Sequence, residues 1–194
     1  MTLITLVRHG QTDWNLERRI QGSTDIPLNE TGRAQARAAA AELAGETIHH
    51  VYASPLRRAF QTAEIIADAL GRPAPLTAVG MREREFGEAE GMLVGDYLER
   101  YGDWQAEVPG GETLDRVTER ALDSIGRIDL AARRRSAPRA ETILVATHGG
   151  VIRALLMHAS GGTLPGDGDV LANGSVHRFA VDRAGIRLVE AAAV

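Results

Sequence analysis

The stretch that decides the fold reads Leu6-Val7-Arg8-His9-Gly10-Gln11-Thr12-Asp13-Trp14-Asn15. A mostly apolar run from Leu3 to Val7 predicts a buried strand that stops at Arg8 and His9. Gly10 then lets the backbone turn sharply and approach a ligand closely. Because ligands of α/β proteins bind at the carboxyl ends of parallel strands, we interpret His9 as a nucleophile and Arg8 as a clamp for oxyanions.

A second strand ends in the same way. The buried run Ile143-Leu144-Val145-Ala146 leads into Thr147-His148-Gly149-Gly150. If the two strands are neighbours in one sheet, His9 and His148 meet at one edge of it. Each histidine taken alone also has a structural interpretation. The pair could bind a metal instead, but no third ligand stands at metal spacing near either one.

Two further charged residues are expected at the same edge. Ser54-Pro55 predicts a helix start, which places Arg57 in the first turn, beside the free N–H groups and the positive end of the helix dipole. Glu83 follows a strand predicted at residues 76–79, although Glu85 is an alternative and either carboxylate could be a solvated surface charge. Several strand and helix ends thus each carry a residue suited to phosphate, and this coincidence favours a site.

The alternation of strands and helices predicts a three-layer α/β sandwich with a mostly parallel central sheet. We expect a single domain over residues 1–194, since no linker, repeat or low-complexity stretch divides the chain. Helices are expected at residues 33–44, 54–70, 114–132 and 151–158, strands at residues 3–7, 50–53, 76–79 and 143–146, and a hairpin at residues 176–189.

Composition excludes several classes of protein. The 194 residues contain no cysteine, which excludes disulfides, a thiolate nucleophile and a thiolate metal site. The formal net charge of −4 gives no indication of a nucleic-acid partner. No segment approaches the ~20 apolar residues that a membrane span needs. Arg8 interrupts the first apolar run too early for a signal peptide, so we expect a cytoplasmic protein, and a homodimer is compatible with the sequence.

Further motifs run along the whole chain. They are Gln21-Gly22, Ser54-Pro55-Leu56-Arg57-Arg58-Ala59 with Gln61-Thr62-Ala63, Glu83, Phe86-Gly87, Glu90-Gly91 and Pro109-Gly110-Gly111-Glu112. Together with residues 6–15 and 147–150, and in this order, they resemble the signature of the histidine phosphatase superfamily, in its phosphoglycerate mutase-like branch. Any one motif is modest support, whereas the ordered set is specific.

The resemblance implies that His9 attacks phosphorus and becomes a phosphohistidine, which splits one difficult displacement into two. Arg8, Arg57 and His148 would hold the equatorial oxygens, with His148 either cationic or donating a hydrogen bond. Glu83 would protonate the leaving alkoxide and then activate water. No metal or other cofactor is expected, because the arginines neutralise the phosphoryl charge. The resemblance also implies a phosphate pocket lined by Asn15, Gln21, Gly22 and Gly149, with Thr12 supporting His9.

The superfamily contains both phosphatases and mutases. A mutase needs a lid that excludes water and cations that bind a carboxylate-bearing substrate. The segment from Met92 to Thr113 carries one basic residue, Arg100, among five acidic ones, and the residues after Val189 form a poor lid. The longer insertion of the true mutases is also missing. We therefore expect a phosphatase acting on small-molecule phosphate monoesters.

Three alternatives stay open, and one residue departs from the family pattern. The alternatives are a phosphoglycerate mutase, a non-catalytic module that binds phosphoesters or phosphoproteins, and a metal-dependent hydrolase. Ala89 stands where many phosphatase-like members carry a tryptophan before the Glu-Gly pair. If this position lines the pocket, the rim of the pocket is less aromatic than in those members.

Overall fold

The computed structural model describes residues 1–166 and 168–192. Its strands are β1 (Thr2–Arg8), β2 (His50–Ala53), β3 (Leu76–Thr77), β4 (Thr142–Thr147), β5 (Val176–Asp182) and β6 (Gly185–Glu190). They form one sheet in the order β3-β2-β4-β1-β5-β6. Neighbours from β3 to β1 are parallel, whereas β5 is antiparallel to β1 and to β6. This arrangement confirms the α/β class and the mostly parallel central sheet.

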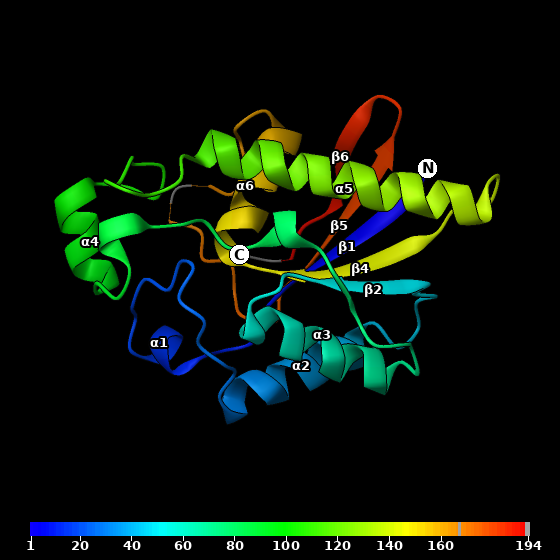
Figure 1. The fold of residues 1–194 in the computed structure, drawn as a ribbon, viewed down its shortest axis with the longest axis horizontal. Helices are drawn as coiled ribbons and strands as arrows, with labels where there is room; N and C mark the ends of the chain where they lie inside the picture. Colours follow the sequence, from blue (N-terminus) through cyan, green and yellow to red (C-terminus); the bar gives the residue numbers. More distant parts are fainter. Residues whose placement is uncertain (167, 193–194) are drawn as a thin grey trace.

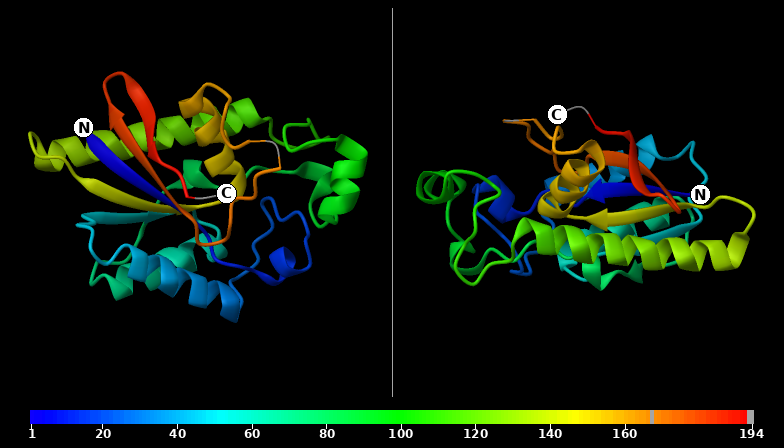
Figure 2. Two further views of the ribbon diagram at one scale, coloured as in Figure 1. Left: turned by 180° about the vertical axis from the view of Figure 1, so that it is seen from behind. Right: turned by 90° about the horizontal axis from the view of Figure 1, so that it is seen from above.

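Helices cover both faces of the sheet, as Figures 1 and 2 show. One face carries α2 (Glu30–Glu42) and α3 (Arg57–Ala69), and the other carries α5 (Leu114–Ser136) and α6 (Gly149–Ser160). Side chains of β1 alternate between the faces, so Ile4 and Leu6 pack with α5 and α6, whereas Val7 packs with α2 and α3. Each such side chain contributes roughly 1.5–3 kcal/mol by leaving water. The shorter elements are α1 (Asp13–Leu16), η1 (Val79–Met81), η2 (Gly87–Ala89) and α4 (Val94–Tyr101).

The register of the two central strands decides where the histidines lie. β1 and β4 are adjacent and parallel, with Val7 opposite Ala146 and Arg8 opposite Thr147. His9 and His148 therefore follow paired positions at the same edge of the sheet. This confirms the prediction that the two motifs share one edge.

Some element boundaries differ from the predicted ones. α3 begins at Arg57 and not at Ser54, because Leu56 directly before it has an extended backbone, while the Ser54 hydroxyl contacts His148. β3 pairs over two residues, since the chain turns into η1 from Val79. α5 continues to Ser136, where Arg133–Arg135 suit the negative end of the helix dipole. No helix in the described residues combines the length and the apolar character that crossing a bilayer requires.

A small lobe lies beside this edge of the sheet and contains α4 (Figure 1). Its apolar core contains Ile20, Phe86, Ala89, Tyr97 and Val108, with Trp104 packed against it. The Trp104 ring stacks on the ring of Tyr97 at a centroid distance of 5.3 Å. The lobe thus has its own packing and holds one wall of the cavity described next.

Candidate active site

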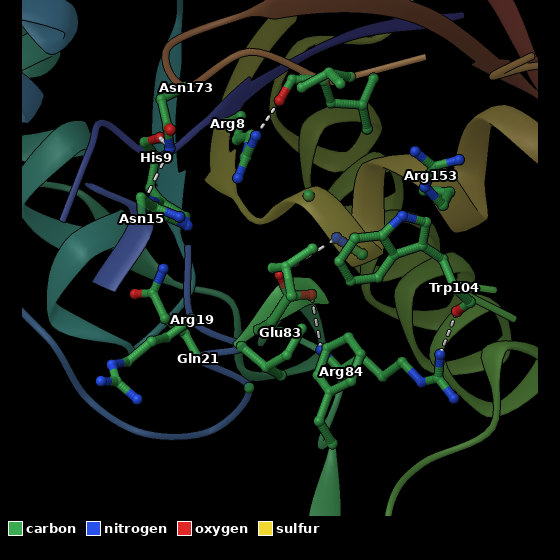
Figure 3. A pocket seen from close by; sticks show the side chains of 18 of the residues that line it. Arg8, His9, Asn15, Arg19, Gln21, Glu83, Arg84, Trp104, Arg153 and Asn173 are labelled. Carbon is green, nitrogen blue, oxygen red and sulfur yellow. Dashed lines mark hydrogen bonds between the residues drawn. The ribbon is translucent and has the colours of Figure 1, made fainter. Parts of the chain in front are cut away.

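A cavity of about 360 Å³ opens where β1 and β4 end. Figure 3 shows Arg8 and His9 at the end of β1, and Glu83 in the segment after η1, pointing into it. Its polar lining comes from residues near the strand ends and from loops: Arg8, His9, Asn15, Arg18, Arg19, Gln21, Gly22, Arg58, Glu83, Arg84, Gly149, Gly150, Arg153, Asp169 and Asn173. Its apolar lining comes mostly from the small lobe and the loop before β5: Ile20, Phe86, Val94, Trp104, Leu114, Val170 and Leu171.

His9 has the geometry of a nucleophile. Its Nδ1 lies 2.7 Å from the carbonyl oxygen of Gly10. A carbonyl only accepts, so Nδ1 carries the proton and Nε2 keeps its lone pair. Burial lowers the pKa of His9 well below its usual value, and the nearby charges of Arg58 and Arg8 act in the same direction. The imidazole is therefore neutral at pH 7, as nucleophilic attack requires.

His148 lies against His9, with the ring centroids 5.2 Å apart. Its Nε2 lies 2.7 Å from the Ser54 hydroxyl, which also accepts a hydrogen bond from the backbone N–H of Leu56. When the Ser54 hydroxyl donates its proton to Nε2, the proton of His148 lies on Nδ1. Burial, Arg58 and His9 lower the pKa of His148 well below its usual value. The His148 ring is thus neutral and not a cation at neutral pH.

Two guanidinium groups flank the histidines, one from the half-buried Arg8 and one from the fully buried Arg58. Arg8 donates from Nη1 to the carbonyl of Leu171. Arg58 donates from Nη1 and Nη2 to the carbonyls of Thr24 and Gly22, at 2.8 and 2.7 Å. Burial lowers the pKa of Arg58 to about 10, so it stays charged at neutral pH. Both arginines keep their cationic character where it can act on an anion.

The structure places Arg57 away from the cavity, which corrects the expectation for this residue. The Arg57 side chain is exposed, and its backbone N–H bonds the carboxylate of Asp25 at 2.7 Å. Arg58 occupies the position that was expected of Arg57. The sequence contained the signal, because Arg58 begins the buried stripe that continues through Thr62 and Ile66, one helical turn apart.

Glu83 lies on the opposite wall from His9 (Figure 3). Its Oε1 accepts from the backbone N–H of Arg84 at 2.8 Å, and its Oε2 accepts from the N–H of Gly150 at 3.3 Å. The described residues that line this cavity do not include Glu85, the alternative candidate. Its Oε1 lies 3.5 Å from Arg82 Nη2 at the surface. Of the two carboxylates, Glu83 is the one positioned to exchange protons with a ligand.

The backbone on both sides of Glu83 is held by Arg120 and Glu112. Arg120 donates to the carbonyls of Gly80, Arg82 and Glu83 at 2.7–3.1 Å, and to both carboxylate oxygens of Glu112 at 2.7 and 2.8 Å. Burial raises the pKa of Glu112, but the bonds from Arg120 outweigh it and the net shift is downward. All five N–H groups of the guanidinium are thus engaged in holding this segment.

The remaining predicted positions fall into two groups. Asn15, Gln21, Gly22 and Gly149 line the cavity. Thr12 is buried behind them, where its hydroxyl contacts Gln21 Oε1 at 2.9 Å and accepts from the N–H of Asn15 at the start of α1. Gly22 has a φ of +54°, and a Cβ there would lie 2.1 Å from Glu90 Oε1. Only glycine fits that position.

Sequence reasoning missed several lining residues. Asn173, Leu171 and Arg153 lie in or face the loop before β5, where no periodic pattern predicts a contact with His9. Asn173 nevertheless donates to the His9 carbonyl at 2.9 Å. Trp104 supplies an aromatic wall, whereas Ala89 is fully buried inside the small lobe. The cavity therefore has an aromatic wall although Ala89 stands where many family members carry a tryptophan.

Comparison with known proteins agrees with this geometry. Residues 4–193 match the histidine phosphatase superfamily (branch 1). The chain belongs to this superfamily. The uncharacterized phosphatase PhoE of Bacillus subtilis is 41% identical over 162 residues, which cover 84% of this chain and 79% of PhoE. The metal-independent phosphoserine phosphatase of Arabidopsis thaliana is 34% identical over 188 residues, which cover 91% of this chain and 75% of the relative.

Solved structures of the superfamily share the fold. The mycobacterial glucosyl-3-phosphoglycerate phosphatase in complex with VO3 superposes with a TM-score of 0.83 and 26% identity, covering 100% of both chains. A 2,3-bisphosphoglycerate-dependent phosphoglycerate mutase of Methylobacterium is 36% identical over 180 residues, which cover 84% of this chain and 85% of the mutase. The relatives of this histidine phosphatase superfamily member thus include both reaction types, and those named as phosphatases support phosphatase activity here.

Proposed function

We propose that this protein is a metal-independent phosphatase that hydrolyses small phosphate monoesters through a phosphohistidine on His9. One observation carries the proposal. Among the described residues, Arg8 Nε, Arg58 Nε and His148 Nδ1 are buried and have no hydrogen-bond partner. Buried N–H groups without partners cost free energy, and the three belong to the groups that surround His9. A phosphoryl group bound beside His9 would give all three an oxygen to bond.

In the first step, the Nε2 lone pair of His9 attacks phosphorus, and the bond between phosphorus and the ester oxygen breaks. Arg8, Arg58 and His148 bind the equatorial oxygens as the transition state forms, which is most of the catalysis in phosphoryl transfer. Glu83 gives its proton to the leaving oxygen, so an alcohol departs and not an alkoxide. The arginines supply the positive charge that a metal ion would otherwise supply.

In the second step, the Glu83 carboxylate takes a proton from water as the water oxygen attacks the phosphohistidine. The bond between phosphorus and His9 Nε2 breaks, inorganic phosphate leaves, and both residues return to their starting states. The N–H groups of Arg84 and Gly150 keep the carboxylate in one place through both transfers. A cytoplasmic location and a homodimeric state stay predictions.

Phosphoglycerate isomerisation is the second candidate function, because mutases stand among the relatives at 35–36% identity. In this chain Arg100, the basic residue of the segment from Met92 to Thr113, pairs with Glu88 at 2.6 Å outside the cavity and is therefore not placed to bind a substrate there. Water-excluding closure would have to come from the small lobe. Hydrolysis is therefore the favoured reaction.

The test is phosphate release from a panel of phosphate monoesters in the presence of a chelator, with isomerisation of 3-phosphoglycerate followed in parallel. Release without isomerisation is the expected result. Isomerisation faster than release would assign a mutase. Loss of all activity in chelator, restored by a divalent metal, would assign a metal-dependent hydrolase, and binding without turnover would assign a binding module.

A further inference from the structure

The charge of the cavity exceeds what a phosphate group requires. Six arginines line it, against two carboxylates, Glu83 and Asp169. The Asp169 carboxylate is already engaged, since its Oδ2 accepts from the N–H of Gly166 at 2.6 Å. A phosphate monoester brings at most two negative charges. A substrate with a single anionic group would therefore leave cationic side chains in the cavity uncompensated.

Most of these arginines have an assigned contact. Arg8 and Arg58 surround His9, and Arg19 forms an ion pair with Glu17 at 2.6 Å. Arg84 donates to the carbonyls of Trp104, Ala106 and Glu112 at 2.5–2.7 Å. Arg18 is exposed to solvent at the mouth of the cavity. Of the arginines that line the cavity, Arg153 remains to be described.

Arg153 is half-buried and makes one hydrogen bond within the described chain, from Nη2 to the carbonyl of Asp169 at 3.0 Å. It has no carboxylate oxygen within 4.0 Å among the residues that the structure describes. A partly desolvated guanidinium with spare donors suits a planar or tetrahedral anion from a ligand.

The position of Arg153 fits the far end of a bound ester. Gly149 lies at the phosphate end, since a Cβ built on it would be 3.3 Å from Arg8 Nε. Arg153 follows four residues later on the same face of α6, about 6 Å further along the helix axis. Figure 3 shows Arg153 and Trp104 on one side of the cavity, with Asn15, Gln21 and Arg19 on the other.

We infer that Arg153 forms a second anion subsite and that the leaving group of the substrate carries a carboxylate or a second phosphate a few bonds from the ester oxygen. The carbon skeleton between the two anions would pack on the apolar wall of Trp104 and Leu114. This inference rests on the proposed phosphatase function and adds the chemical class of its substrate.

The test compares three esters that differ at one end only: 3-phosphoglycerate with a carboxylate, glycerol 1,3-bisphosphate with a second phosphate, and glycerol 3-phosphate with neither. R153M is expected to lower kcat/KM for one or both anion-bearing esters by roughly 10- to 100-fold, the range for losing a hydrogen bond between charged groups. The ester that loses more identifies the anion. The kcat/KM for glycerol 3-phosphate should fall much less than this, and R153K should recover part of the loss.

R100M is the matched control, because it removes the same charge from an arginine paired with Glu88 outside the cavity. Equal losses on all three esters, or no loss on either anion-bearing ester, would overturn the subsite. If the wild type releases phosphate from none of the three, the proposed function is judged by the wider panel of monoesters, and the subsite is judged by binding. In that case calorimetry in the H9A background should show tighter binding of an anion-bearing ester than of glycerol 3-phosphate, and R153M should abolish the difference. Equal affinities before the substitution would overturn the inference.

Discussion

Arg57 and Arg58 are neighbours in the sequence, but only Arg58 is expected to contribute to catalysis. Replacing each in turn with methionine tests this difference. Arg58 is fully buried beside His9, whereas Arg57 is exposed. Removing one donor to the transition-state oxygens lowers kcat by roughly 10²- to 10³-fold. R58M is therefore expected to lose at least about 100-fold in kcat on p-nitrophenyl phosphate. R57M is expected to keep wild-type kcat.

The stability of R58M needs its own measurement. The substitution leaves the carbonyls of Thr24 and Gly22 without the donors that now lie 2.8 and 2.7 Å away. Each unsatisfied carbonyl costs about 1–3 kcal/mol, so the thermal midpoint should fall, whereas an exposed change such as R57M stays within about 0.5 kcal/mol. R58K retains the positive charge and some bonding capacity, and it should lie between R58M and the wild type in kcat.

The assay is steady-state phosphate release with the thermal midpoint of each variant recorded beside it, at a temperature where all variants are folded. Wild-type kcat in folded R58M would refute the placement of Arg58 at the reacting phosphoryl group. A loss in R57M as large as that in R58M would refute the distinction between the two residues.

The other predictions follow from the same contacts. E83Q should lose most of its rate on alkyl phosphates and much less on an aryl phosphate with an acidic phenol, because only a poor leaving group needs the proton; equal losses would move the acid role elsewhere. R120K and E112Q should shift the pH profile and, like E83Q, lose more rate on alkyl phosphates than on the aryl phosphate. A purely structural role would lower the rates on both kinds of ester alike. Burial lowers the pKa of His177 to about 4 in the folded protein. As the pH falls from about 6.5 toward 4, this histidine is protonated in the unfolded chain but not in the folded protein, which favours unfolding. The thermal midpoint should fall over that range, and H177Q should make the fall shallower in a denaturation series; an unchanged slope would show that His177 contributes nothing.

The strands and the two histidine motifs were predictable because local patterns determine them. The apolar runs before His9 and His148 predict buried strands, and parallel pairing then brings their ends together. Arg58 was also within reach of sequence reasoning, since it begins the buried stripe of α3. A helix start at Ser54-Pro55 favours Arg57, whereas the helix of the structure begins at Arg57 and the Ser54 hydroxyl contacts His148.

Other parts of the site depend on contacts between distant segments. Asn173 reaches the His9 carbonyl from 164 residues away, and the loop that carries it has no periodic pattern. Trp104 reaches the cavity because it packs on Tyr97 inside the small lobe, while Ala89 is buried there. The local sequence does not show that Trp104 lines the cavity and that Ala89 is buried, because both positions depend on how the whole lobe packs.

The most direct test of the central claim is to trap the phosphoenzyme. Wild-type protein is mixed with a ³²P-labelled phosphate monoester in chelator, quenched within one turnover, and digested for peptide mapping. The proposed mechanism predicts an acid-labile, alkali-stable label on His9 that is absent from H9A and accumulates when a good leaving group makes the first step fast. A label on another residue, or full turnover by H9A, would contradict nucleophilic catalysis by His9.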